Sequence, residues 1–370
     1  MNAAFDILPV TLLTGFLGSG KSTVLADVLQ GEHAQDTAVL VNEFGDVGLD
    51  HLLIREVDAR TVLLDNGCVC CSIRGELKEA LATLFSQRIR GEVPPFSRVI
   101  VETTGLAMPA PIIATLLADP AIRNHYTLHT VVTVVDAVNA FEQQRQYPEW
   151  LAQVTAADHL LLTKSDLVEA DRVPALFDTL RMLNPAAPVS IRAPDDHDAL
   201  RTTLFTAGHA ETLLQRIGST HKARLSAGYA GYAGYAGYAG YAGYAGSDRL
   251  AHRAALRADQ PANATPAIKA FCIEIAAPID WQIFTIWFTL LLNRHGDKIL
   301  RVKGVLSIAG ASKPVVLHGV RHLVHPVLHL DRWPDPRRDS RIVFITEDIE
   351  QAEIEASYRR FCEHLEEQTQ

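Results

Sequence analysis

The chain has 370 residues, 48% hydrophobic and 21% charged, a balance typical of a globular protein with room for two hydrophobic cores. The formal net charge of −9 provides no basic surface, so the composition argues against nucleic acid or an anionic membrane as a partner. The first residues lack the basic and apolar segments of a signal peptide, and no apolar run reaches the length of a membrane span, so we expect a cytoplasmic protein.

The first expected strand leads directly into a phosphate-binding motif. Residues 8–14 form a short apolar run typical of a buried strand, and residues 15–22 (GFLGSGKS) match the P-loop pattern at every fixed position. Glycines in such a loop let backbone N–H groups surround phosphate oxygens, and the helix expected at Thr23–Gln30 directs its positive end at the same anion. We expect Lys21 to reach the β- and γ-phosphates of a nucleoside triphosphate, and the Ser22 hydroxyl to ligate Mg²⁺.

The second expected strand, Thr37–Val41, runs into the polar, glycine-rich segment Asn42–Gly48. In an open α/β sheet the C-terminal ends of the strands carry the ligands, and loops at this position in nucleotide hydrolases commonly respond to the γ-phosphate. Glu43 and Asp46 are therefore candidate ligands for Mg²⁺ or for a second metal. A solvated turn that binds nothing is an equally good interpretation of the same residues.

A cluster of cysteines follows the next expected strand, Arg60–Leu64. Cys68, Cys70 and Cys71 fall in one loop, and cysteines crowded in this way indicate metal or redox chemistry in a reducing compartment. In extended chain Cys68 and Cys70 point to the same side and can share one soft cation, whereas Cys71 joins them only if the backbone turns. Thiolates select Zn²⁺, Co²⁺ or Cu⁺ over Mg²⁺, and a site built from one loop stays open to exchange. Buried free cysteines and a redox-active thiol pair are the alternatives.

A carboxylate stands at the end of the following strand. Residues 73–90 have the apolar spacing of a helix, and the strand expected at Arg98–Val101 ends in the segment ETTG, residues 102–105. An acidic residue followed three positions later by glycine occupies the place of the second phosphate-binding motif of P-loop enzymes, where Asp is usual. We expect Glu102 to act on Mg²⁺ through water, and the Gly105 N–H to sense the γ-phosphate.

A base-recognition motif follows a later strand. The segment TKSD, residues 163–166, resembles the guanine-specificity motif N-K-x-D, whose aspartate accepts hydrogen bonds from guanine while the lysine stem covers the ring. Asp166 is the reason to expect GTP and not ATP, and Thr163 stands where the strict motif has Asn. The other helices and strands expected in this half of the chain lie at residues 109–117, 130–135, 159–163, 189–191 and 195–205.

The composition changes near residue 208. Residues 227–246 repeat Gly-Tyr-Ala, and a tract of this kind cannot bury an apolar face, so it predicts a flexible linker over residues 208–264. Alternating and apolar segments return at residue 267 and predict a compact α+β domain with a mostly antiparallel sheet. Its strands are expected at residues 267–275, within 300–309, and at 314–318, 324–330 and 341–346; its helices are expected at residues 280–292, with Asp280 as N-cap, and 350–368.

Four histidines crowd into this second half: His318, His322, His325 and His329. On strands, the first pair and the last pair fall on opposite parity, so their side chains do not face the same way. Surface or hydrogen-bonded histidines are the preferred interpretation, and a second metal site is the alternative.

Taken together, the segments GFLGSGKST, NEFGDVG, GCVCC, ETTG and TKSD resemble the CobW family of metallochaperone GTPases. Segments of the second half, including RVKGVL and SRIVFI, resemble the CobW C-terminal domain. We therefore divide the chain into a P-loop GTPase domain with a mostly parallel sheet (1–207), the linker (208–264) and a smaller α+β CobW C-terminal-like domain (265–370). The resemblance implies GTP–Mg²⁺ binding, loading of a transition metal, zinc first and cobalt next, and its release into a client protein on GTP hydrolysis.

The motifs and the resemblance together assign roles to residues, and the resemblance itself covers Gly18–Thr23, the three cysteines, Lys164 and Asp166. The nucleotide residues are expected to be Gly15, Gly18, Ser19, Gly20, Lys21, Ser22, Thr23, Gly105, Thr163, Lys164 and Asp166. The transition metal is expected on Cys68, Cys70 and Cys71, Mg²⁺ on Ser22, and a further metal contact on Glu43; Lys21 and Glu102 are the expected catalytic residues. No residue is an obvious general base, so we expect slow hydrolysis through positioning and electrostatics. The alternatives are a regulatory P-loop NTPase with redox-sensing cysteines and a metal-buffering protein in which GTP is structural.

Overall fold

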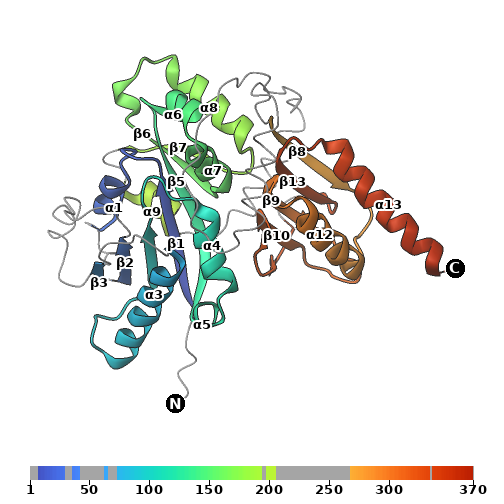
Figure 1. Ribbon diagram of the computed structural model, residues 1–370, viewed down its shortest axis with the longest axis horizontal. Coiled ribbons are helices and arrows are strands. Elements are labelled where there is room, and N and C mark those ends of the chain that lie inside the picture. The colour runs from blue at the N-terminus through green and yellow to red at the C-terminus, as the bar shows by residue number, and fades with distance from the viewer. Residues whose placement is uncertain are drawn as a thin grey trace, which may run out of the picture.

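The computed structural model describes residues 7–29, 36–41, 62–65, 73–193, 197–205, 267–333 and 336–369. These residues form two units that lie side by side, one around β1 and β5 and the other around β9 and β13 (Figure 1). Within these residues no helix is long and apolar enough to cross a lipid bilayer. The predicted linker, residues 208–264, lies outside the described residues.

The first unit is built on a parallel sheet that is covered on both faces. Among the described residues seven strands pair in the order β3-β2-β4-β1-β5-β6-β7, and β1 lies at the centre between β4 and β5. Every residue of β2 and β6 is buried, which explains why these strands read as unbroken apolar runs. The strands are β1 (Leu8–Gly15), β2 (Thr37–Val41), β3 (Val62–Asp65), β4 (Arg98–Glu102), β5 (Tyr126–Asp136), β6 (His159–Thr163) and β7 (Val189–Ile191).

Helices pack on both faces of this sheet because side chains alternate along β1. Leu12 belongs to a core cluster with α3 and α4, whereas the neighbouring Leu13 belongs to a cluster with α1 and α9. The helices are α1 (Lys21–Leu29), α3 (Ile73–Arg90), α4 (Pro109–Ala118), α5 (Pro120–Arg123), α6 (Ala140–Gln146), α7 (Pro148–Ala156), α8 (Arg172–Leu183) and α9 (His197–Phe205). This is the predicted P-loop NTPase fold. The sequence analysis missed α5, α6, α7 and α8, although Pro148 at the first position of α7 was a usable start signal.

The second unit is an antiparallel sheet with two helices. The described strands pair in the order β11-β10-β9-β13-β8, with β12 on β10, and each pairing is antiparallel. The strands are β8 (Ile268–Ile275), β9 (Ile299–Leu306), β10 (Val315–Val320), β11 (Leu323–Val324), β12 (Leu328–His329) and β13 (Ser340–Glu347). The strand predicted over 324–330 was wrong as one element: Pro326 has no N–H to donate and separates β11 from β12.

Two helices, α12 (Trp281–His295) and α13 (Gln351–Thr369), supply apolar side chains to the core of this unit. Asp280 accepts hydrogen bonds from the backbone N–H groups of Gln282 (2.9 Å) and Ile283 (3.0 Å), so the predicted N-cap is confirmed. Phe284 of α12 stacks against aromatic neighbours and is buried with Phe344 of β13. The predicted α+β domain with an antiparallel sheet is confirmed.

A buried ionic cluster joins the two units. Asp158, directly before β6, forms ion pairs with Arg301 and Lys303 of β9, and the Lys303 Nζ lies 2.8 Å from the Asp158 Oδ1. The Arg301 Nη1 also donates to the carbonyl of Ala156 at 2.9 Å, while the Asp158 Oδ2 accepts from the Val131 N–H at 2.9 Å. Both cations are 1% exposed. Docking the units in another arrangement would bury one of these charges without its partner, so this cluster fixes how they dock.

The four histidines of the second unit do not meet at one point, but the expectation that the first pair and the last pair face different ways was wrong for His318 and His325. His318 lies on β10 and His325 follows the antiparallel β11, so parity along a single strand does not relate them. His318 and His325 lie with ring centroids 5.7 Å apart, whereas His322 contacts the Leu292 carbonyl and Asp297, and His329 is exposed. No group of three or more His, Cys, Asp or Glu side chains suited to a metal occurs among the described residues. The preferred interpretation, surface or hydrogen-bonded histidines, is confirmed for His322 and His329.

The pKa values of groups near this cluster shift in opposite ways. Burial opposes the charge of Asp158, but Arg301 and Lys303 outweigh it and hold the pKa of this carboxyl well below its usual range. Burial and the nearby charge of Lys303 hold the pKa of His318 well below its usual range. The negative charge of Asp158 acts in the opposite direction but is outweighed. Burial, with Arg301 and Lys303 near it, lowers the pKa of His325 to about 3. Both histidines are therefore neutral in the folded protein at neutral pH.

We predict that the free energy of unfolding falls as the pH falls from 7.5 to 5.5. The unfolded chain protonates His318 and His325 near their ordinary pKa of about 6.5, while the folded protein keeps them neutral, so the unfolded state binds more protons. The pair should account for a loss of roughly 3 kcal/mol between pH 7.5 and pH 5.5. Urea unfolding at both pH values should show a smaller loss in the H318Q/H325Q variant, with H329Q as the exposed control. An equal loss in all three proteins would contradict the prediction.

Candidate nucleotide site

The P-loop connects the end of β1 to the start of α1 through a conformation that needs glycine. Gly15 has φ +146°, and a Cβ there would lie 2.4 Å from the Val134 carbonyl oxygen, so only glycine fits beside β5. Gly18 and Gly20 also have positive φ angles. The Ser19 N–H donates to the Phe16 carbonyl (3.1 Å) and closes the turn that precedes Lys21. The predicted strand–loop–helix context of the P-loop is confirmed.

The two residues predicted to act on Mg²⁺ meet in the structure. The Ser22 Oγ donates to the Glu102 Oε1 at 3.0 Å, although 80 residues separate them in the chain. Glu102 is buried at the end of β4, and Lys21 is buried at the start of α1. A hydroxyl and a carboxylate side by side are the hard oxygen ligands that Mg²⁺ prefers, so these residues fit the ion.

The segment after β4 lies directly against the P-loop. A Cβ on Gly105 would lie 2.6 Å from the backbone nitrogen of Leu17, so the close approach of the two backbones requires glycine at this position. Thr103 adds two hydrogen bonds to β1, from its N–H to the Leu13 carbonyl (3.0 Å) and from its Oγ1 to the Thr14 Oγ1 (2.9 Å). Residues 102–105 thus hold a fixed position relative to the phosphate-binding loop.

The residues of the TKSD segment secure the P-loop from the side of β6. The Thr163 Oγ1 donates to the Ser19 carbonyl at 2.7 Å and lies 3.2 Å from the Val135 carbonyl oxygen. Lys164 has a left-handed backbone conformation, with φ 57°, and its Nζ donates to the Gly18 carbonyl at 2.7 Å. Thr163 therefore fills the place of the Asn of the strict motif with a hydroxyl that contacts the P-loop backbone. Asp166 lies exposed in the short helix η2 (Ser165–Leu167).

Asp136, at the end of β5, holds Lys164 in place, and the sequence analysis did not single it out. Its Oδ2 lies 2.8 Å from the Lys164 Nζ, and its Oδ1 accepts from the Val138 N–H at 2.8 Å. Burial alone would raise the pKa of Asp136, but hydrogen bonds from Lys164 and Asn139 outweigh it and lower the pKa. A carboxylate that ends a buried strand, as at Glu102, was the signal that could have identified it.

The predicted metal ligands lie outside the described residues: Cys68, Cys70, Cys71 and Glu43. The strand β2 leads to Glu43 and the strand β3 leads to the cysteines, and both strands end level with Glu102. Val41 of β2 is in register with both Asp65 of β3 and Glu102 of β4. The segments that follow β2 and β3 therefore leave the sheet at the edge that carries the P-loop.

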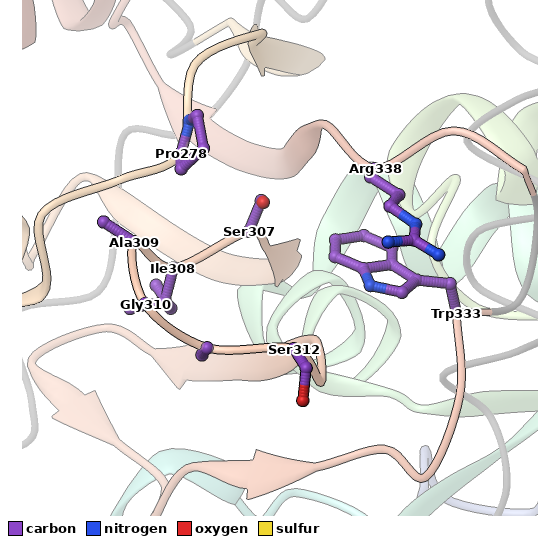
Figure 2. Close-up of a pocket in the computed structure, with 9 residues that line it drawn as sticks. Pro278, Ser307, Ile308, Ala309, Gly310, Ser312, Trp333 and Arg338 are labelled. Atoms are coloured by element: carbon purple, nitrogen blue, oxygen red, sulfur yellow. The ribbon is translucent and has the colours of Figure 1, made fainter.

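A surface hollow of about 410 Å³ lies elsewhere, in the antiparallel unit. It is lined by Pro278, residues 307–312, Trp333 and Arg338. The side chains of Trp333 and Arg338 lie next to each other (Figure 2). None of the predicted nucleotide or metal residues lines it. The hollow is therefore separate from the candidate nucleotide site.

Comparison with known proteins identifies the family. Residues 9–190 match the model of the CobW/HypB/UreG nucleotide-binding domain, and residues 268–362 match that of the cobalamin synthesis protein CobW C-terminal domain. The chain is 32% identical over 352 residues to the zinc chaperone YjiA of Escherichia coli, and the alignment covers 95% of this chain and 98% of YjiA. The chain belongs to the CobW family of P-loop GTPases.

Other relatives agree with this assignment of the CobW-family chain. It is 28% identical over 380 residues to the zinc chaperone CobW of Pseudomonas aeruginosa, covering 94% of this chain and 89% of that protein. The crystal structure of Zn(II)-bound YjiA GTPase from E. coli superimposes with a TM-score of 0.63 and 28% identity, over 96% of this chain and 99% of that one. The resemblance noted in the sequence is thereby confirmed for both domains.

We predict that Thr163→Val weakens GDP binding about fivefold, because the Ser19 carbonyl loses its hydroxyl donor and the P-loop loses a support worth about 1 kcal/mol. Thr11→Val is the matched control: Thr11 is equally buried, and its hydroxyl donates to the Leu204 carbonyl of α9 (2.7 Å) and not to a P-loop carbonyl. Both variants should lose thermal stability. Titration with a fluorescent GDP analogue should show weaker binding in Thr163→Val alone, and equal affinities in the two variants would contradict the prediction.

Proposed function

We propose that this CobW-family GTPase is a zinc metallochaperone that loads Zn²⁺ on Cys68, Cys70 and Cys71 and releases it to a client protein when GTP is hydrolysed. The observation that carries the proposal is the register of Val41 with both Asp65 and Glu102. Asp65, where the strand that leads to the cysteines ends, therefore lies level with Glu102 and two strands away from it. Relatives named as zinc chaperones, YjiA and CobW, support zinc ahead of cobalt as the cargo.

The nucleotide part of the proposal assigns each described contact a role. The P-loop holds the phosphates, Ser22 and Glu102 hold Mg²⁺, and the Gly105 N–H faces the γ-phosphate. Asp166 recognises guanine while the Lys164 stem covers the base. Mg²⁺, when bound, neutralises charge that develops on the phosphate oxygens, and Lys21 acts on the same charge. No side chain among the described residues of this site is placed as a general base, so intrinsic turnover is slow.

The metal part rests on the chemistry of thiolates. Two or three thiolates on one loop bind Zn²⁺ firmly yet leave a coordination position for a water molecule, for Glu43 or for a ligand from the client. Such a site exchanges metal more readily than a closed site with four protein ligands. If GTP and Zn²⁺ both order the segments after β2 and β3, each must raise the affinity of the other by the same factor. Hydrolysis then lowers the affinity for zinc at the moment of transfer.

We expect the affinity for Zn²⁺ to rise when a non-hydrolysable GTP analogue and Mg²⁺ are bound, and to fall with GDP, because the proposed coupling links zinc binding to the γ-phosphate. The measurement is a chelator competition titration with Zn²⁺ and, in parallel, Co²⁺, in the presence of the analogue, of GDP or of no nucleotide. The C68S/C70S/C71S variant should lose this binding, and C272S, in the antiparallel unit, should retain it.

Three outcomes would count against the proposal. A zinc affinity that ignores the nucleotide would favour a metal buffer in which GTP is structural. Unchanged zinc affinity in the triple serine variant would favour redox-sensing cysteines. A stronger nucleotide response with Co²⁺ than with Zn²⁺ would make cobalt the cargo.

Asp166→Ala should reduce GTP affinity by at least tenfold and leave the weak ATP affinity unchanged. The carboxylate is expected to accept two charge-assisted hydrogen bonds from guanine, each worth about 1.5–3 kcal/mol, and adenine has no matching donors. Asp171→Ala is the matched control, since Asp171 is also exposed and makes no side-chain cap bond to α8. Competition of GTP and ATP against a fluorescent nucleotide measures both, and undiminished GTP preference in Asp166→Ala would rule out this role.

A further inference from the structure

A buried glutamine of α7 holds the segment that lies against the P-loop. Gln153 is 0% exposed, and its Nε2 donates to the Gly105 carbonyl at 3.0 Å and to the Ala107 carbonyl at 3.1 Å. Both amide hydrogens are thus directed at one segment. A buried amide is tolerated only where such partners exist, so the position of α7 and the position of residues 105–107 are linked.

The segment that Gln153 holds has little freedom on its other side. The Cα of Gly105 approaches the Leu17 backbone so closely that a Cβ there would lie 2.6 Å from the Leu17 nitrogen. Gly105 is therefore fixed between the P-loop and the Gln153 amide. A shift of α7 would move the Gly105 carbonyl, and with it the neighbouring peptide whose N–H is proposed to face the γ-phosphate.

The C-terminal end of the same helix is held by the antiparallel unit. Ala156, one turn beyond Gln153, is the last residue of α7, and its carbonyl accepts from the Arg301 Nη1 at 2.9 Å. Arg301 also pairs with Asp158, which in turn contacts Lys303 of β9. The antiparallel unit thus grips α7 at a point one helical turn from the side chain that holds Gly105.

We propose that Gln153 is a positioning residue for GTP hydrolysis: α7, set in place by Arg301, uses the Gln153 amide to hold Gly105 where its N–H meets the γ-phosphate. This inference rests on the proposed role of Gly105 in GTP binding. It gives the antiparallel unit a part in hydrolysis although none of its described residues belongs to the nucleotide site.

Gln153→Met tests the proposal, because methionine has a similar length and volume but no donor. We expect GDP affinity to stay within twofold, since GDP has no γ-phosphate. Affinity for a non-hydrolysable GTP analogue should fall five- to tenfold, and kcat for GTP hydrolysis about tenfold. An unchanged ratio of the two affinities together with an unchanged kcat would overturn the proposal.

Tyr126→Phe is the matched control, because it also removes a single buried donor. Tyr126 is 1% exposed, and its hydroxyl donates to the Leu81 carbonyl of α3 (2.9 Å), not to α7 or to residues 105–107. Thermal unfolding should show that both variants fold with reduced stability. The ratio of analogue to GDP affinity should change only in Gln153→Met, and an equal change in Tyr126→Phe would reduce the effect to general destabilisation and overturn the proposal.

A double-mutant cycle with Arg301→Lys tests the far end of the route. Lysine keeps the positive charge beside Asp158 but lacks the fork that also reaches Ala156. We expect Arg301→Lys to lower kcat several-fold on its own and to add nothing to Gln153→Met, because both changes release the same segment. Additive losses in kcat would overturn the route through α7.

The result also separates this inference from the proposed function. Suppose that the wild-type protein hydrolyses GTP and prefers the GTP analogue to GDP. If Gln153→Met then shows the same affinity ratio and the same kcat as the wild type, the inference fails and the proposed function stands. If the wild-type protein does not distinguish the analogue from GDP, the role of Gly105 fails, and both proposals fall together.

Discussion

The close backbone contact between Gly105 and the P-loop is the constraint on which the rest of this site depends. Two main chains can approach to this distance only where a Cβ is missing, and the contact fixes β4 against the turn that leaves β1. From the opposite side, Thr163 and Lys164 donate to the carbonyls of Ser19 and Gly18. The phosphate-binding loop is therefore held between two strand ends. A loop fixed in this way loses little entropy when an anion binds, which favours tight nucleotide binding.

The second constraint is the ionic cluster of Asp158, Arg301 and Lys303. Buried ion pairs seldom add much net stability, since the cost of removing the charges from water offsets their attraction. Their effect is on geometry: any other arrangement of the two units would leave one of these charges buried and unpaired. The cluster also holds the C-terminal end of α7, because Arg301 donates to the Ala156 carbonyl and also pairs with Asp158. Domain docking and the placement of α7 are thus one structural feature.

Features that depend on neighbouring residues could be predicted from the sequence, whereas features that depend on contacts between distant residues could not. The strands β1, β2, β4, β6 and β13 were predicted within about two residues, because each is an apolar run that ends at a motif or a polar residue. The meeting of Ser22 with Glu102 was expected because two phosphate-binding motifs assign both side chains to Mg²⁺. The alternation Arg301-Val302-Lys303 is typical of a strand with one solvated face, yet both cations are buried against Asp158, 143 residues away from Arg301. No local pattern contains that information. Gln153 was missed for the same reason, since its partners lie 46 and 48 residues away.

The strand order of the parallel sheet places the nucleotide site between the strand that leads to the cysteines and the strand that meets the antiparallel unit. The cysteine-bearing segment begins at β3, at one edge, while α7 and β6 meet the antiparallel unit towards the other side, and the two lie apart in Figure 1. Between them lie β4 and β1, which carry Glu102, Gly105 and the P-loop. A change at the cysteines that is carried through the described sheet therefore crosses the strands that hold the nucleotide. If the cargo and the client act at opposite sides of the sheet, the γ-phosphate is the group best placed to make each respond to the other, and GTP hydrolysis gives that response a direction.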